Sequence, residues 1–473
     1  MWGRTVQGNM SDRPMRLELE VRPLGLPDPS PEMSGSSFRR GGFSMLNGDD
    51  MDEAVGGNEL GGTRLDEARQ HLSSDTRTFV NLLISFVGAG ILGIPYAFRQ
   101  GGLLLSAVCM SLVGAICTYC MWMLVKSKYR VVEFRGRHDR GPVKYADVCH
   151  EALGKVGLVA VETALVASQA GFSTAYLVFI ARNLNALFSF HKAPVILLCL
   201  PGLVALCLIK HLKHLAPFSL IAEVVNLTGL AVVFFEDAEF MGINHETISL
   251  ANWRAFPFVF GVAVYCFEGT GMIIPVEDAM LNRASFTRIL SVVMLIYTTL
   301  CVISGGLGYL AFGDATEDII LLNIGSTTST LIVKISFCIG LYFTFPIMMV
   351  PVWEVLEFKW LKNASSPSYD RDRNAIRCGT VLATGFLACV VPNFGLFVSL
   401  IGSSCCSLLA FILPTMCYSR LERRAGFPLG LARSILNNLI LAGGVFAMVS
   451  GTADTLKRIA LEYYGGAGAG DTQ

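Results

Sequence analysis

Long runs of apolar residues alternate with short polar segments from about residue 77 to residue 456. A helix needs roughly 20 predominantly apolar residues to cross the hydrocarbon core of a bilayer, and most of these runs approach or exceed that length. The pattern therefore predicts an all-α polytopic membrane protein with eleven transmembrane helices. The predicted spans are 77–98, 103–126, 159–189, 193–209, 215–235, 253–276, 287–312, 329–356, 376–391, 393–413 and 434–456.

Residues 1–74 lack any apolar periodicity and carry Gly, Ser, Pro and mixed charge, including an acidic run at Asp49–Glu53. Such a composition buries too little apolar surface to offset the entropy of folding, so we expect a disordered tail. The tail has no charged segment followed by an apolar one, as a signal peptide would. The first span is therefore not expected to be removed by cleavage.

The loops between the predicted spans differ in their basic residues. Lys and Arg number 24 in the tail next to the first span and in the loops on its side, against 6 on the opposite side. Cytoplasmic loops carry the excess of Lys and Arg in membrane proteins. The asymmetry predicts a cytosolic N-terminus, and the odd number of spans places the C-terminus in the lumen or outside the cell.

Composition excludes several classes of protein. The chain is 53% hydrophobic and 16% charged, which is unlike a soluble domain, and its net charge of zero gives no reason to expect nucleic acid as a partner. Most of the 14 cysteines lie in apolar runs, and the Cys117–Cys120 spacing has no accompanying histidine or second pair. We therefore expect neither a metal nor a cofactor.

Gly88, Gly90, Gly93 and Pro95 interrupt the first span near its middle. Glycine and proline weaken a helix, and in a membrane the freed backbone groups need partners other than lipid. The pattern predicts a broken helix that lines a polar transport site, although close packing of helices through small residues is an alternative. The same glycines match a dinucleotide-binding fingerprint, but the strand and the acidic residue that this motif requires are absent.

The sixth predicted span has a similar interruption at Gly269, Gly271 and Pro275. Two broken helices at equivalent places in two halves are typical of an inverted-repeat transporter with its site between the halves. We therefore divide the chain into a tail (1–74), two five-helix repeats (75–235 and 236–413) and a segment with the eleventh helix (414–473).

Two acidic residues, Glu268 and Glu223, lie deep within predicted spans. A carboxylate there is costly unless it is protonated, paired or hydrated. Glu268 could bind a substrate ammonium, carry a coupling proton or cap the half-helix that begins near Gly269. Glu223 could take up the coupling proton or make a buried hydrogen bond to a neighbouring helix.

Four stretches carry a resemblance to the amino acid/auxin permease family, and most of all to its plant-type vacuolar amino acid exporters. They are Phe79–Asn81 with Val87–Tyr96, Ser168–Phe172, Val264–Met272 and Tyr342–Pro346, and the similarity extends over residues 75 to 457. The resemblance implies the leucine-transporter fold of the amino acid–polyamine–organocation superfamily. Glu223 stands in Ile-Ala-Glu-Val-Val, where that branch would have an aspartate, which leaves the reach of this acid open.

The resemblance also implies site residues. By this carry-over, Thr344 matches a position where sodium-coupled relatives hold part of a cation site. The residues that match the substrate-facing parts of the two broken helices are Gly88, Ala89, Gly90, Phe267, Glu268 and Gly269.

These observations favour a secondary active transporter of neutral amino acids, coupled to protons and exporting from a vacuole-like or lysosome-like lumen into the cytosol. The expected partners are an amino acid, protons and the lipid bilayer, while any protein that binds the tail is unknown. A plasma-membrane location, a carrier of auxin-like substrates and a receptor that senses amino acids without net transport remain alternatives. No catalytic constellation is present in the spans, so an enzyme is not expected.

Overall fold

The computed structural model describes residues 72–136, 141–188, 191–209, 229, 231–232, 248–325, 328–361, 368–427 and 429–467. Within these ranges the regular elements are helical, and the one β feature is an isolated bridge between Ser73 and Met280. Seven of the described helices are long and apolar enough to cross a membrane, and a bent pair makes an eighth span. The prediction of an all-α, multi-pass membrane protein is confirmed.

The helices up to residue 209 correspond to the first four predicted spans. The first span consists of α2, a 3₁₀ turn η2 and α3, and the helices on either side of the break are bent by 41°. The elements are α2 (Asp75–Phe86), η2 (Ala89–Gly93), α3 (Ile94–Gly101), α4 (Leu103–Arg135), α5 (Tyr145–Phe188) and α6 (Lys192–Cys207).

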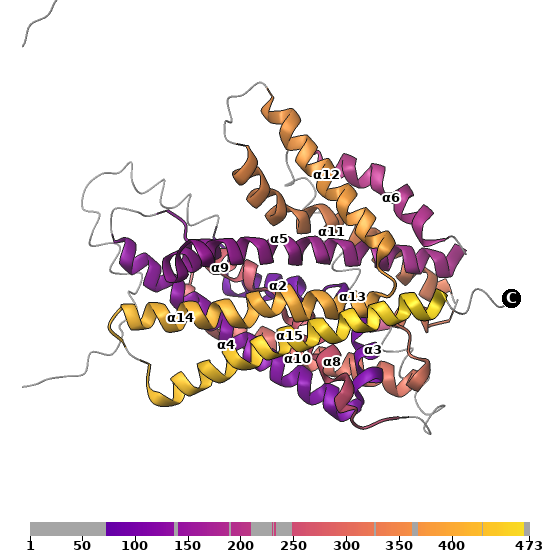
Figure 1. Ribbon diagram of the computed structural model, residues 1–473, viewed down its shortest axis with the longest axis horizontal. Helices are drawn as coiled ribbons and strands as arrows, with labels where there is room; N and C mark the ends of the chain where they lie inside the picture. Colours follow the sequence, from indigo (N-terminus) through magenta and orange to yellow (C-terminus); the bar gives the residue numbers. More distant parts are fainter. Residues whose placement is uncertain are drawn as a thin grey trace, which may run out of the picture. The chain divides into compact units, whose positions relative to one another are not determined.

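The helices after residue 252 correspond to predicted spans six to eleven (Figure 1). Their bounds are α8 (Phe256–Phe267), α9 (Thr270–Asp278), α10 (Phe286–Phe312), α11 (Thr328–Trp360), α12 (Tyr369–Val390), α13 (Phe394–Ile401), α14 (Leu413–Arg424) and α15 (Leu431–Ala467). Two π-helical turns, η9 (Gly402–Cys406) and η10 (Leu408–Ile412), join α13 to α14 in one 31-residue span.

The predicted division between the ninth and tenth spans is present. Helix α12 ends at Val390, and the Asn393 side chain accepts a hydrogen bond from the Leu396 amide at 3.1 Å, which caps the start of α13. The tenth span was predicted to end at residue 413 but continues to Arg424. Polar residues in its last three turns hid this extension, although Thr415, Glu422 and Arg424 among them bond to α4 and α5 and do not end the helix.

Helix α5 starts at Tyr145, earlier than the predicted residue 159, but the part before Gly154 is a separate helical segment. It bends at Gly154, whose φ of 69° lies in the region that favours glycine. The predicted fifth span, 215–235, falls almost entirely outside the described residues. The total of eleven spans and the boundaries of the two repeats therefore stay predictions.

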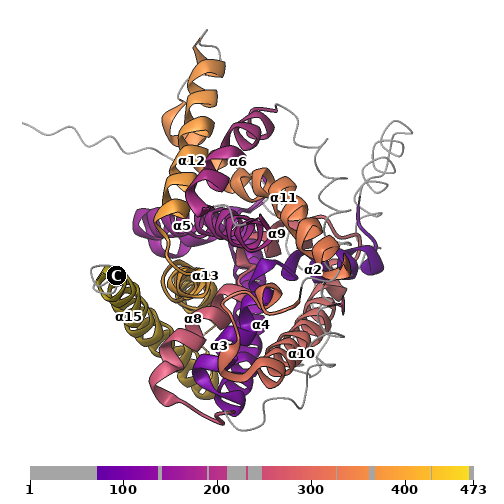
Figure 2. The ribbon, with the colours of Figure 1, turned by 90° about the vertical axis from the view of Figure 1, so that its right-hand side faces the viewer.

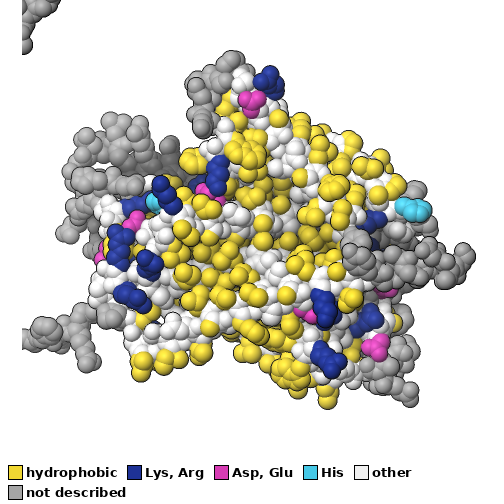
Figure 3. Space-filling model, viewed as in Figure 1, with side chains coloured by type: hydrophobic (Ala, Val, Ile, Leu, Met, Phe, Trp, Pro, Cys, Tyr) yellow, Lys and Arg dark blue, Asp and Glu magenta, His cyan; other side chains and the backbone are white. Residues whose placement is uncertain are grey.

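Loops that were predicted to share a side of the membrane do meet at one end of the bundle. Lys128 at the end of α4 pairs with Asp278 at 2.6 Å, and Arg424 at the end of α14 pairs with Glu151 in α5 at 2.6 Å. We call this the basic end. At the opposite end, the Asn252 amide donates to the Gly101 carbonyl at 2.7 Å. Figure 3 shows hydrophobic side chains across the middle of this face, with Lys and Arg gathered toward its two ends.

The two broken spans run in opposite directions. Asp75, at the start of α2, accepts a hydrogen bond at 2.8 Å from Ser285, just after α9. The Gly101 carbonyl, at the end of α3, meets the segment that leads into α8. An inverted repeat requires this antiparallel arrangement of its first helices.

Helix α8 packs against α3, α4, α13, η9 and α15, whereas α12 packs against α6 and α5 (Figure 2). The contact between α8 and η9 is close, because a Cβ on Gly402 would lie 1.8 Å from the Gly261 carbonyl oxygen. Small residues allow such backbone contact between membrane helices, where burial from water supplies no driving force.

Candidate functional site

The first break separates α2 from a second half-helix, Ala89–Gly101. Gly88 joins them in an extended conformation, with φ −107° and ψ −175°. The Ala89 and Gly90 amides are the first of the new half-helix, and neither donates to an acceptor among the described residues. A Cβ on Gly88 would have no neighbour within 4 Å among the described residues, so there is open space at the residue that precedes these amides.

The second break separates α8 from α9 at Glu268 and Gly269. The Glu268 carboxylate accepts a hydrogen bond at 3.1 Å from the amide of Thr270, the first residue of α9. A carboxylate in this position compensates the positive end of a helix. The capping interaction that we considered for Glu268 is therefore present.

The two breaks lie against each other. A Cβ on Gly90 would lie 3.0 Å from the Tyr265 ring and 3.2 Å from the Cys266 sulfur, both in the last turn of α8. A Cβ on Gly269 would lie 2.6 Å from the ring of Phe86, the last residue of α2. The start of the second half-helix of the first break thus lies against the end of α8, and the end of α2 lies against the second break.

Tyr297 of α10 links the two breaks. Its ring lies 5.7 Å from that of Phe86 and 5.4 Å from that of Phe267, which is fully buried. Its hydroxyl donates to the Cys266 carbonyl at 3.2 Å, which satisfies one of the acceptors left by the end of α8. Tyr297 holds both helix ends in place through packing and this hydrogen bond.

The Ser168–Phe172 stretch of α5 borders the same region. Phe172 lies 4.8 Å from Tyr265 in an edge-to-face arrangement, and a Cβ on Gly171 would lie 2.8 Å from Ile401 of α13. The π-helical turns follow directly after Ile401. Such turns are rare in proteins, and where they occur they are often at functional sites. Four elements, η2, α5, α8 and α13, therefore meet at the breaks.

The structure adds less about the other residues that the sequence proposed for the site. The Thr344 side chain is buried in α11, and its hydroxyl donates to the Gly340 carbonyl of its own helix at 2.9 Å. Glu223 lies outside the described residues. No group of three or more His, Cys, Asp or Glu residues in the part of the chain that the structure describes is arranged to hold a metal ion.

Sequence reasoning missed Tyr265 and Tyr297. Both lie in apolar spans, where a tyrosine gives no local signal of its partners. Tyr265 stands directly before the second break, which is the one feature that could have singled it out.

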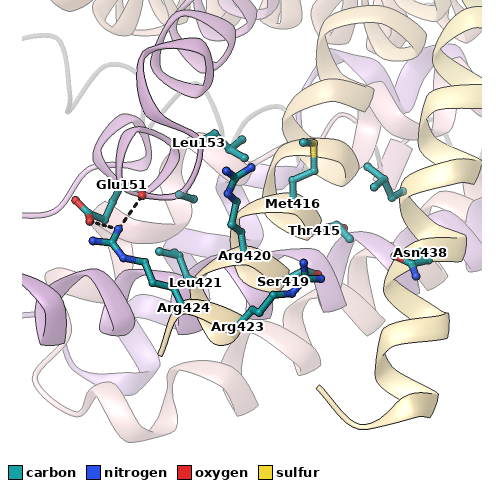
Figure 4. A pocket seen from close by; sticks show the side chains of 12 residues that line it. Glu151, Leu153, Thr415, Met416, Ser419, Arg420, Leu421, Arg423, Arg424 and Asn438 are labelled. Carbon is teal, nitrogen blue, oxygen red and sulfur yellow. Dashed lines mark hydrogen bonds and ion pairs between the residues drawn. The ribbon is translucent and has the colours of Figure 1, made fainter. Parts of the chain in front are cut away.

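A groove of about 820 Å³ lies elsewhere, at the basic end between α5, α14 and α15 (Figure 4). Its lining includes Glu151, Arg420, Arg423 and Asn438 and none of the residues of the two breaks. The groove is therefore a separate feature.

Comparisons with known proteins agree with this geometry. A family model described as transmembrane amino acid transporter protein matches residues 71–457. Amino acid transporter AVT3B of Arabidopsis thaliana is 35% identical over 405 residues, which cover 82% of this chain and 94% of that protein. Vacuolar amino acid transporter 3 of Saccharomyces cerevisiae is 31% identical over 405 residues, 82% of this chain and 57% of that protein.

Among solved structures, the inward facing conformation of Mhp1 superposes with a TM-score of 0.54 at 11% identity. The match covers 83% of this chain and 92% of that chain. Identity this low supports the fold alone. That fold is the leucine-transporter type that the family resemblance implied.

Proposed function

The chain belongs to the transmembrane amino acid transporter family, and from that premise we propose that it moves neutral amino acids by proton-coupled alternating access. Members of this family are transporters rather than enzymes, so the question is what the site binds and what drives it. The observation that carries the proposal is the contact between two broken, antiparallel helices, where two amides have no acceptor among the described residues.

The substrate carboxylate binds the Ala89 and Gly90 amides in this proposal. Both amides stand at the positive end of the half-helix Ala89–Gly101, where an anion is stabilised by donors and by the helix dipole. Gly88 leaves room for the carboxylate to approach, because a Cβ there has no neighbour within 4 Å.

The substrate ammonium is placed at the end of α8. Carbonyl groups at the C-terminal end of a helix carry partial negative charge, and Glu268 adds a carboxylate directly after Phe267. Helix-end amides at the first break and a carboxylate at the second match the two charges of a zwitterionic amino acid. Glu268 thus contributes to the binding site while it caps α9.

The lining of this region favours a substrate with an uncharged side chain. Within the break segments 86–95 and 264–275, Glu268 is the one charged residue. The rings that surround them, Phe86, Phe172, Tyr265 and Tyr297, offer apolar surface. A second charge on the substrate would be desolvated without a partner, which is costly.

We assign the coupling proton to Glu223 and keep Glu268 as a second candidate. A carboxylate within an apolar span is most stable when protonated, so it can take up a proton on one side of the membrane and release it on the other. The proposed direction is from a vacuole-like or lysosome-like lumen into the cytosol, with a cytosolic N-terminus. The vacuolar relative in yeast supports a vacuole-like membrane, and the Lys and Arg asymmetry of the loops supports the orientation.

The test uses the full chain in proteoliposomes with a fixed pH difference. Net accumulation of labelled amino acid reports proton-driven transport, and counterflow reports exchange without a driving force. Glu223→Gln should lose accumulation and keep counterflow, whereas Glu268→Gln should weaken both, because it also lines the site. Normal accumulation by Glu223→Gln would place the coupling group elsewhere, and a protein that binds substrate but moves none would instead be a sensor.

A further inference from the structure

The groove at the basic end has two kinds of lining. Near the C-terminal end of α14 the lining is basic, with Arg420, Arg423 and Arg424. One turn earlier on the same helix it is apolar, with Met416 (Figure 4). Leu441 of α15 lines the groove as well. Since α14 leaves the membrane at its arginines, the basic part lies at the level of the lipid headgroups and the apolar part faces the hydrocarbon.

One of the three arginines is already neutralised. Arg424 pairs with Glu151 at 2.6 Å, and its guanidinium lies 5.1 Å from the Phe134 ring centre. Glu422, the other nearby acid on α14, faces away from the groove and pairs with Arg130 at 2.9 Å. The acids around the groove are therefore engaged.

Arg420 and Arg423 differ from Arg424. All three are exposed and line the groove, but the side chains of Arg420 and Arg423 make no hydrogen bond or ion pair with the described residues. They are three residues apart on one helix face, so their guanidinium groups can bind one anion together. Ser419 and Asn438 offer further polar groups in the same lining.

The flank of the groove is suited to lipid. Met416 in its lining is 36% exposed, and α15, which lines the groove with Asn438 and Leu441, carries exposed apolar residues at Ile435, Leu436 and Leu439 (50%, 45% and 64%). Apolar surface of this kind on a transmembrane helix contacts acyl chains. A soluble anion would use only the arginines, whereas a lipid uses both parts of the groove.

We propose that this groove binds an anionic phospholipid, with its phosphate on Arg420 and Arg423 and an acyl chain along Met416 and Leu441. Basic pockets between transmembrane helices are suited to lipid headgroups, and Arg binds phosphate oxygens in a two-pronged geometry. The site is separate from the two helix breaks, so it does not depend on which substrate the protein carries.

The experiment measures lipid binding to the full-length chain in detergent by native mass spectrometry. The lipid probes are phosphatidylserine and phosphatidylcholine. The soluble probes are the deacylated headgroup glycerophosphoserine and inorganic phosphate, each tested separately. Phosphatidylserine should bind more tightly than phosphatidylcholine, and the double variant Arg420→Gln/Arg423→Gln should reduce its affinity about tenfold or more, because two charge-assisted contacts are lost.

The matched control is Arg288→Gln/Arg371→Gln, which removes the same charge from two exposed arginines at the basic end on α10 and α12. Its affinity for phosphatidylserine should stay within twofold of the native chain. The proposal is overturned if both double variants behave alike or if phosphatidylcholine binds equally well. If glycerophosphoserine or phosphate binds as tightly as the lipid, the groove is a site for soluble anions instead.

Discussion

Gly88 offers the sharpest test of the binding site at the first break. Its backbone is extended, a conformation that any residue adopts, and a Cβ there would meet no atom of the described residues within 4 Å. Gly88→Ala should therefore fold normally. It should even gain about 0.4–1 kcal/mol in the free energy of unfolding, because alanine restricts the unfolded chain.

Transport should respond differently from stability. The added methyl group occupies the space beside the Ala89 and Gly90 amides, where we place the substrate carboxylate. Displacing the carboxylate from one amide removes a hydrogen bond to a charged group, worth about 1.5–3 kcal/mol. This corresponds to a rise of roughly 10- to 150-fold in the apparent KM, and Gly88→Val should exceed it.

Two further glycines serve as comparisons. Gly443→Ala also adds a Cβ without neighbours, but on α15 and away from the breaks, so it should leave the KM unchanged. Gly90→Ala places a Cβ 3.0 Å from Tyr265, so that side chain must shift by a few tenths of an ångström and stability should fall.

The assay is concentration-dependent counterflow in proteoliposomes, with thermal unfolding of each purified variant. A native KM for both Gly88→Ala and Gly88→Val would refute the reasoning, because the open space would then not hold the substrate. A raised KM with an unchanged or higher unfolding temperature supports it.

Other contacts give predictions of the same kind. Lys128→Met leaves the fully buried Glu277 carboxylate without its ion-pair partner and should lower the free energy of unfolding by about 3–5 kcal/mol. Adding Glu277→Leu should recover most of this loss. If thermal unfolding shows the single and double variants to be equally unstable, the pairing is contradicted. Tyr297→Phe keeps the ring and loses the hydrogen bond to the Cys266 carbonyl, so the free energy of unfolding should fall by about 1 kcal/mol. No measurable change would mean that the hydroxyl does not hold this helix end. A tag placed after Gln473 should resist protease in sealed, right-side-out vacuoles and be cleaved once detergent is added, whereas cleavage without detergent would place the C-terminus in the cytosol.

The sequence alone determined the class of the protein and the places of its breaks. A membrane leaves no water for backbone groups, so spans must be apolar and helical, and a Gly- and Pro-rich interruption such as Gly88–Pro95 is visible locally. The Lys and Arg counts likewise sorted the loops, and residues from loops assigned to one side, such as Lys128 and Asp278, meet in the structure.

Only the tertiary structure decided which groups meet. Phe86 contacts Gly269, Lys128 pairs with Glu277, and Tyr297 reaches the Cys266 carbonyl, each across a long separation in sequence. Hydrophobic periodicity is a property of a single helix, so it gives neither the neighbours nor the rotation of that helix about its axis. For the same reason the sequence left the role of Glu268 open, and the fold, by placing its carboxylate on the Thr270 amide, showed that it caps a half-helix.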